Sequence, residues 1–240
     1  MLQPSVLSDH EAVSQFTADW LLEHLRRQPN ALLCLATGST PTRTYELLAQ
    51  RGAAEPDLFA SVRVLNLDEW GGLPPGDPGS CDRHLRSTLV DPLRLTARYV
   101  SFASQPTDPA AECDRIAEWL ARHGPIDVSL LGLGINGHIG FNEPAEYLQP
   151  HAHVAQLSEA SLSHAMVRSG GARPTFGLTL GMADLLQSRH VLLLVTGAAK
   201  RQPLQQLLNG CITTKFPASL LHVHPNAMLL CDEQAHPLCP

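Results

Sequence analysis

The sequence predicts an α/β fold: a three-layer Rossmann-like sandwich, with a mainly parallel central sheet and helices on both of its faces. Short apolar runs typical of buried strands alternate with amphipathic stretches typical of helices. Glycines and other turn-forming residues follow the apolar runs. No Pro/Ser-rich linker, repeat or low-complexity tract divides the 240 residues. We therefore expect residues 1–240 to form a single domain.

The chain is expected to open with an amphipathic helix. Ser8 and Glu11 match the spacing of a capping box, in which two side chains satisfy the first free amides of a helix. Apolar side chains then recur at helical spacing from Val13 to Leu25.

Five apolar runs predict the buried strands. They cover residues 31–36, 62–67, 126–131, 191–195 and 227–231. The stretches between them predict four helices. The first runs from residues 37–41 to Gln50, the second starts at Asp108-Pro109 and ends at Gly124, and the others cover 178–186 and 198–208. The Gly/Pro-rich residues 71–80 predict a long loop.

Composition and charge restrict the class of function. The chain has 17 Lys and Arg against 23 Asp and Glu, a net charge of −6 without a basic block, so we expect no nucleic-acid partner. No apolar run approaches the ~20 residues of a membrane span. Residues 1–13 lack the features of an export signal. We therefore expect a cytoplasmic protein with no membrane partner. The 6 cysteines include no CxxC pair, which argues against disulfides and zinc.

The segment Gly132–Pro144 follows a predicted strand and concentrates glycines, an imidazole and a carboxylate. Its glycine spacing matches a dinucleotide-binding motif and nearly matches a phosphate-binding loop. Pro144 opposes the helix that the first motif needs, and His138-Ile139 stands where the second needs Lys and Ser/Thr. We instead expect glycines such as Gly137 and Gly140 to bring the backbone close to a small ligand.

Two side chains are candidates for proton transfer. His138 has a side chain that titrates near neutral pH, and Asn136 and Glu143 lie close enough in sequence to fix its tautomer. Asp68 and Glu69 end a predicted strand, and strand alternation directs only one of them into a given cleft. Asp68 is favoured as the base because it stands at the carboxyl end of its strand.

The turn Thr37-Gly38-Ser39-Thr40 offers hydroxyls and free amides at a helix N-terminus, which suits a phosphate group. Lys200 follows another strand and could supply a cation. An ordinary turn and a solvated lysine are the alternative interpretations. His151-x-His153 and His222-x-His224 lack further ligands at the usual spacing, so we predict no metal site.

Taken together, these motifs resemble the glucosamine-6-phosphate deaminase/isomerase family along nearly the whole chain. The ending Phe141-Asn-Glu-Pro144 after Gly137-His138 distinguishes the deaminases from the related 6-phosphogluconolactonases. Other segments are most similar to the galactosamine-6-phosphate deaminase/isomerase branch: Leu67-Asp-Glu-Trp70, Pro78-Gly-Ser-Cys81, Glu146-x-Leu-Gln-Pro150 and Pro217-Ala-Ser-x-Leu221.

The resemblance implies conversion of an amino-hexose 6-phosphate into a ketose 6-phosphate and ammonia, without a cofactor. Galactosamine 6-phosphate giving tagatose 6-phosphate is favoured, and glucosamine 6-phosphate giving fructose 6-phosphate is the alternative. A 6-phosphogluconolactonase or a non-catalytic sugar-phosphate sensor are further alternatives. A homo-oligomer is left open.

The resemblance also implies residue roles. Asp68 matches the family's base, His138 the group that opens the sugar ring, Glu143 its orienting partner, and Thr37–Thr40 with Lys200 the phosphate site. Asn136 stands where many members have Asp. His164 aligns with the family's phosphate-binding arginine, with Arg168 or Arg173 as substitutes.

Overall fold

The computed structural model describes residues 2–163 and 165–238, and its centre is a parallel sheet. Within that part of the chain, seven strands lie in the order β1-β10-β9-β6-β2-β3-β5, and every pair is parallel. Their bounds are β1 Pro4–Leu7, β2 Leu32–Leu35, β3 Arg63–Asn66, β5 Tyr99–Val100, β6 Val128–Gly132, β9 His190–Val195 and β10 Ala227–Asp232. The five predicted strands are confirmed.

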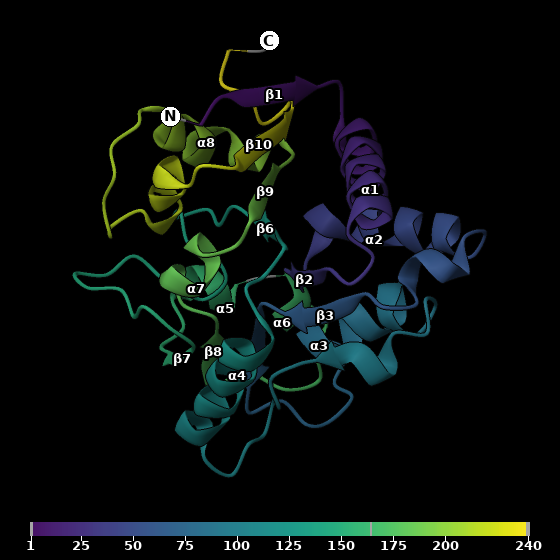
Figure 1. The fold of residues 1–240 in the computed structure, drawn as a ribbon. Coiled ribbons are helices and arrows are strands. Elements are labelled where there is room, and N and C mark those ends of the chain that lie inside the picture. The colour runs from purple at the N-terminus through teal and green to yellow at the C-terminus, as the bar shows by residue number, and fades with distance from the viewer. Residues whose placement is uncertain (1, 164, 239–240) are drawn as a thin grey trace.

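Helices cover both faces of this sheet (Figure 1). One face packs on α1 His10–Arg27, α2 Ser39–Gly52 and the short helical segments η1 Pro56–Phe59 and η2 Arg86–Val90, while η3 Thr96–Arg98 leads into β5. The other packs on α4 Pro109–His123, α7 Met182–Leu186, α8 Arg201–Leu208 and η5 Pro217–Val223. Alternation along the strands produces this division, since Leu33 and Leu35 of β2 face the first group while Leu32 and Cys34 face the second. The predicted three-layer fold is therefore confirmed.

A second, antiparallel sheet was not predicted. It has the order β4-β8-β7, formed by β4 Asp68–Gly71, β8 Phe176–Thr179 and β7 His153–Ala155. A single residue, Leu67, separates β3 in the central sheet from β4 in the second one. Asp68 therefore lies where the chain passes from one sheet to the other.

Two predictions about local structure are wrong. The segment predicted as a helix over 178–186 is instead β8 followed by α7, because residues 176–179 pair with β4 and β7. The helix predicted at the N-terminus is preceded by β1, which pairs with β10. Its cap is Asp9, whose carboxylate accepts from Ala12 N at 2.8 Å. Glu11 does not close a capping box but pairs with Arg43 of α2 at 2.7 Å.

The order of the strands has a switch point between β2 and β6. From β2 the chain moves outward through β3 to β5, and it then returns to β6 on the other side of β2. The loops that leave these two strands therefore diverge over opposite faces of the sheet, which opens a crevice at their carboxyl ends. The turn at residues 37–40 and the loop at 133–144 border this crevice.

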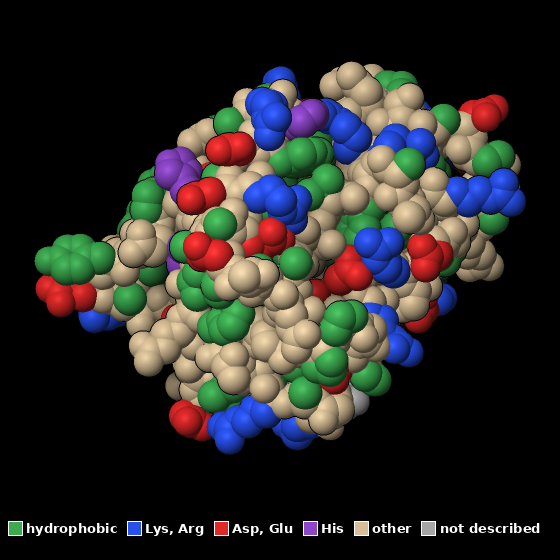
Figure 2. Space-filling view, turned by 90° about the horizontal axis from the view of Figure 1, so that it is seen from below, with side chains coloured by type: hydrophobic (Ala, Val, Ile, Leu, Met, Phe, Trp, Pro, Cys, Tyr) green, Lys and Arg blue, Asp and Glu red, His purple; other side chains and the backbone are tan. Residues whose placement is uncertain are grey.

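The surface agrees with the mixed charge of the sequence. On the face that Figure 2 shows, Lys and Arg side chains are interspersed with Asp and Glu side chains. In the described residues, no helix has the length and apolar character needed to cross a membrane.

Candidate active site

A cavity of about 300 Å³ occupies the switch point. Its walls come from the segments that follow β2, β3, β6 and β9, together with α5 Glu159–Leu162 and α6 Ala165–Ser169. The cavity brings together eight of the side chains or backbone segments singled out in the sequence: Thr37, Gly38, Ser39, Thr40, Asp68, His138, Gly140 and Lys200.

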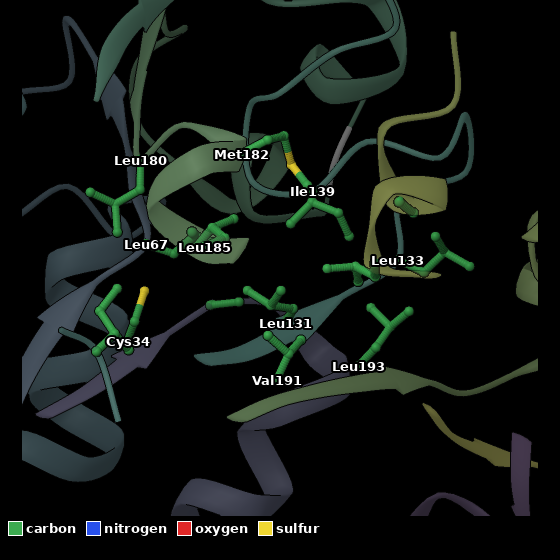
Figure 3. Close-up of a cluster of buried hydrophobic side chains, with 14 of the residues drawn as sticks. Cys34, Leu67, Leu131, Leu133, Ile139, Leu180, Met182, Leu185, Val191 and Leu193 are labelled. Carbon is green, nitrogen blue, oxygen red and sulfur yellow. The ribbon is translucent and has the colours of Figure 1, made fainter. Parts of the chain in front are cut away.

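The segments around the cavity are anchored in one hydrophobic cluster. Leu67 precedes Asp68, and Leu133 and Ile139 flank the turn that carries His138; all three are buried in the same core. Figure 3 shows these side chains together with Met182 of α7 and Leu131 of β6. Because each functional residue adjoins a buried anchor, the backbone of the site is fixed by packing on the core.

Asp68 and Glu69 point to opposite sides of β4. Asp68 lines the cavity and is only 8% exposed. Burial and the adjacent negative charge of Glu69 raise the pKa of Asp68 to about 7. A carboxylate with such a pKa is suited to take up and release a proton near neutral pH. Glu69 is fully buried outside the cavity and accepts hydrogen bonds at the start of α3 Cys81–Leu85.

Cys81 connects Asp68 with the turn after β2. The hydroxyl of Thr37 donates to Cys81 Sγ at 3.1 Å, and the thiol in turn interacts with the Asp68 carboxylate. Burial raises the pKa of Cys81 well above its usual value, so the thiol stays protonated. The sequence offered no separate signal for this role, because a lone cysteine in a helix gives no indication of its neighbours.

His138 and Glu143 form a pair at the cavity wall. Nδ1 of His138 lies 3.4 Å from Oε2 of Glu143. Burial would raise the pKa of Glu143, but the His138 ring and hydrogen bonds from Ser161 and Asn136 outweigh it and lower the pKa to about 2. Asn136 donates to Glu143 Oε2 at 2.9 Å, so the amide supports the carboxylate and not the imidazole.

Serines of α5 complete the shell of Glu143. Ser158 caps α5 and donates to Glu143 Oε1 at 2.8 Å, and Ser161 donates to the same oxygen. The carboxylate that pairs with His138 thus also binds the N-terminal end of α5. The sequence pattern Ser158-x-x-Ser161 indicates a helix cap, but it does not indicate that the helix docks on Glu143.

Two glycines of the loop allow neighbouring side chains to pack directly against its backbone. A β-carbon at Gly134 would lie 2.4 Å from the His138 ring, so this glycine gives the ring its place. Gly140 has a φ of +57°, and a β-carbon there would lie 2.7 Å from Thr179 Oγ1 and 3.3 Å from Asp68 Oδ2. Side chains at either position would displace a group that lines the cavity.

The turn after β2 and Lys200 form the polar end of the cavity. Gly38 occupies the N-cap position of α2 with a φ of +108°, and it has no side chain to cap the first amides of the helix. Lys200, in η4 Ala198–Lys200, directs its ammonium to Leu133 O at 2.6 Å, and burial lowers its pKa. A helix N-terminus and a half-buried cation favour an anion.

Residues 158–163 and 165–172 form one side of the cavity, and Asp77 binds the far end of the second of these segments. Ser161, Ser163 and Met166 line the cavity. The buried carboxylate of Asp77 accepts from Gly171 N at 3.0 Å and from Ala172 N at 3.2 Å. The loop between β4 and α3 therefore holds this wall in place.

Other residues singled out in the sequence lie elsewhere. Gly137 lies behind the cavity wall, where its carbonyl accepts from Ala218 N at 2.9 Å. Asn136 and Glu143 lie behind His138. His164 lies outside the described residues. Arg168 donates to the Ser163 carbonyl, and neither it nor Arg173 is among the described residues that line the cavity.

The histidine pairs are engaged with the protein. His222 accepts from Leu2 N and contacts the Leu207 carbonyl. His224 contacts the Ser188 carbonyl, while His151 pairs with Asp184 at 2.8 Å. Among the described residues, no group of three or more potential ligands is arranged for a metal ion.

A cavity at the switch point of a parallel sheet is typical of α/β proteins that bind a small ligand, and comparison with known proteins gives the family. The family described as glucosamine-6-phosphate isomerases/6-phosphogluconolactonase matches residues 8–230. The candidate deaminase AgaI of Escherichia coli (strain K12) is 39% identical over 225 residues, which cover 93% of this chain and 89% of that protein. The chain therefore belongs to this family of enzymes, and the resemblance inferred from the sequence is confirmed.

Two further relatives extend the likeness over almost the whole chain. The glucosamine-6-phosphate deaminase of Geobacillus sp. (strain WCH70) is 37% identical over 245 residues, covering 97% of this chain and 94% of the relative. A solved structure of a monomeric glucosamine-6-phosphate deaminase, described as the missing link of the NagB superfamily, matches with a TM-score of 0.92. It is 33% identical, and the match covers 98% of each chain.

Proposed function

We propose that this protein converts an amino-hexose 6-phosphate and water into a ketose 6-phosphate and ammonia. The observation that carries the proposal is the buried carboxylate of Asp68, whose pKa is raised to about 7, in the same cavity as His138 and Lys200. A base of this pKa is suited to removing a proton from carbon next to a carbonyl group. The named deaminases among the relatives support the same reaction.

The reaction requires proton transfers at three positions of the sugar. His138, oriented by Glu143, takes the proton of the C1 hydroxyl and returns it to the ring oxygen, which opens the pyranose to an aldehyde. Ionised Asp68 removes the proton from C2 and delivers it to C1, while an amine proton ends on O1. C2 is then an imine carbon, and addition of water with loss of ammonia leaves the ketose. These steps need no cofactor.

The phosphate is proposed to bind at the polar end of the cavity. The first amides of α2, the hydroxyls of Ser39 and Thr40, and the Lys200 ammonium are its donors. Thr37 directs its hydroxyl to Cys81, so we expect it to contribute through its backbone. A sugar held by its phosphate here would extend toward Asp68. Because phosphorylated sugars are retained inside cells, we propose that the protein acts in the cytoplasm.

Galactosamine 6-phosphate is the favoured substrate, with tagatose 6-phosphate as the product. Two residues of the motifs that resemble the galactosamine branch, Trp70 and Cys81, line the cavity and would therefore lie near the sugar. Glucosamine 6-phosphate, giving fructose 6-phosphate, is the alternative. The two substrates differ only in the configuration at C4.

Release of ammonia tests the proposal. The protein is incubated separately with galactosamine 6-phosphate, glucosamine 6-phosphate and 6-phosphogluconolactone, and ammonia and lactone consumption are measured. We expect ammonia from an amino sugar phosphate, with the larger kcat/KM for the galacto epimer. Asp68→Asn should slow the release by ~10² to 10⁴, whereas Asp57→Asn, an exposed control in η1, should not change it. Consumption of the lactone alone would refute the deaminase proposal.

A further inference from the structure

Glu69 lies beside the proposed base but is arranged differently. Its carboxylate accepts four hydrogen bonds, two at each oxygen. Oε1 accepts from Trp70 N at 2.8 Å and from Cys81 N at 2.9 Å. Oε2 accepts from Ser80 Oγ at 2.9 Å and from Asp82 N at 2.7 Å. These four bonds use all the acceptor positions of a carboxylate, so no lone pair is left to take a proton from a substrate.

The donors favour the ionised form of Glu69. Three of the four are backbone amides, and two of those belong to the first residues of α3, where amides are otherwise free. Burial raises the pKa of Glu69 above its usual value, and the hydrogen bonds from Asp82, Cys81, Ser80 and Trp70 limit that rise. A proton on this carboxyl group would displace at least one of the donors.

Asp68 lacks such a set of hydrogen-bond donors, and its side chain lines the cavity. Its carboxylate is buried next to Glu69 and interacts with the thiol of Cys81. The negative charge of Glu69 disfavours ionisation of Asp68, although the two side chains point to opposite sides of β4. A proton that enters the pair therefore goes to the carboxylate with fewer donors, which is Asp68.

We propose that Glu69 is a positioning residue for Asp68: it keeps a fixed negative charge beside the base and holds the start of α3 against it. This inference rests on the proposed function, since it assigns to Glu69 the control of when Asp68 can accept a proton. It also explains the two adjacent carboxylates at the start of β4. One is the exchanging group, and the other sets its affinity for the proton.

Other groups near Asp68 do not supply this negative charge. Burial raises the pKa of the thiols of Cys34 and Cys81 and of the Tyr45 phenol, so these groups stay neutral near pH 7. The cationic or titratable groups that share the cavity, His138 and Lys200, would lower the pKa of Asp68 when protonated. The titratable groups whose charge state acts on Asp68 are therefore Glu69, Cys81, Cys34, Tyr45, His138 and Lys200.

The test compares Glu69→Gln with Glu112→Gln. Glu112 is a matched control because it is also a buried carboxylate that accepts a backbone amide, from Ala103, but it lies in α4 away from the cavity. In Glu69→Gln, the midpoint of the acid limb of kcat/KM should fall by about one pH unit or more. At low pH this variant should then retain about tenfold more of its plateau activity than the wild type does. Glu112→Gln should leave the midpoint unchanged.

An unmoved midpoint in a folded Glu69→Gln variant would overturn the proposal, because a residue that only caps α3 would change stability or kcat at every pH.

If Glu69→Gln does not fold, a carboxyl-carbon NMR titration of the unmodified protein tests the proposal instead. The Asp68 signal is assigned by its loss in Asp68→Asn. We expect Asp68 to titrate near neutral pH while Glu69 remains ionised. The proposal would be refuted if Glu69 took up its proton at a higher pH than Asp68, or if Asp68 titrated near its usual pKa. Neither result requires activity, so it is independent of the proposed reaction.

Discussion

Asp68 and Glu143 show how two carboxyl groups of one candidate site acquire different protonation properties. Burial and a neighbouring negative charge raise the pKa of Asp68 to about 7, whereas Glu143, which is also partly buried, has a pKa lowered to about 2. The difference arises from partners: Glu143 has a histidine, an amide and two serine hydroxyls, while Asp68 has a carboxylate and a thiol beside it. The first is held ionised, and the second can exchange a proton.

The raised pKa of Asp68 predicts how activity depends on pH. Only the ionised carboxylate can accept the C2 proton. We therefore expect kcat/KM to rise with pH, with a midpoint near pH 7, and to reach a plateau at higher pH. Measurement of kcat/KM for ammonia release between pH 5.5 and 8.5 checks this. Asp68→Asn should lower the plateau by ~10² to 10⁴. A profile that is flat down to pH 5.5 would contradict the assignment of Asp68 as the base.

Gly134 permits a second test at the residue scale. Because a β-carbon there would lie 2.4 Å from the His138 ring, Gly134→Ala should displace the ring and lower kcat by about 10². The substrate phosphate binds elsewhere, so KM should change less. Gly132→Ala is the comparison within the cavity wall: Gly132 also lines the cavity, but a β-carbon there meets no protein atom within 4 Å and leaves the His138 ring in place, so its effect should be much smaller. Equal losses in the two variants would argue against a role for His138 in the rate.

Lys200 predicts an effect on binding. Charged hydrogen bonds contribute about 1.5 to 3 kcal/mol, so Lys200→Met should raise KM about 10- to 100-fold with a smaller change in kcat. The measurement is steady-state kinetics at saturating and subsaturating substrate. Lys215, which lies in the loop before η5 and outside the cavity, provides the matched control. A large fall in kcat with KM unchanged would assign Lys200 to the chemical step instead.

At the scale of elements, strands with continuous apolar runs were predictable and the second sheet was not. The runs that became β2, β3, β6, β9 and β10 are buried on both faces, so most of their residues are apolar, and apart from Ser129 in β6 the polar ones lie at strand ends. In β8 and α7, by contrast, Leu178, Met182 and Leu185 have the spacing of one helical face. Pairing of residues 176–179 with β4 and β7 decides their conformation, and sequence spacing carries no information about those partners.

The wall of the cavity was predictable only in part. The loops after parallel strands meet at one edge of the sheet, so grouping Thr37–Thr40, Asp68, His138 and Lys200 followed from the strands alone. Ser161, Ser163 and Met166 reach the cavity through contacts distant in sequence, with Glu143 at one end of their segment and Asp77 at the other. Such contacts leave no periodic signal.

Asp77 is therefore expected to control this wall. Asp77→Ala removes the acceptor for Gly171 N and Ala172 N, so the segment 165–172 should exchange its amide hydrogens faster and KM should rise several-fold. Hydrogen exchange measured by mass spectrometry, together with steady-state kinetics, checks both effects. Asp57→Ala, in the exposed turn η1, is the control. Unchanged exchange of 165–172 would show that other contacts hold the segment.

At the scale of the whole molecule, the raised pKa of Asp68 lowers the free energy of unfolding near neutral pH. The unfolded chain would ionise Asp68 near its usual pKa of 3.8, but the folded protein raises that pKa to about 7. A carboxyl group whose pKa is raised by folding contributes most below the unfolded value, and its contribution is lost as the pH rises to the folded value. Over about three pH units, the cost reaches up to about 4 kcal/mol. The hydrophobic clusters on both faces of the sheet must offset it.

Asp68→Asn should therefore unfold at a higher urea concentration than the wild type, by an amount that depends on pH. The variant keeps the shape of the side chain but cannot ionise, so the two proteins should have similar midpoints near pH 4. The gap should widen as the pH rises to 7 and then stay constant, because above pH 7 Asp68 is ionised in both the folded and the unfolded wild type. Urea unfolding at pH 4, 5.5, 7 and 8.5 measures this gap. Asp57→Asn, at an exposed position, should show no such trend. A gap of the same size at every pH would mean that Asp68 is not held in a state that resists ionisation, and the proposed base would lose its physical ground.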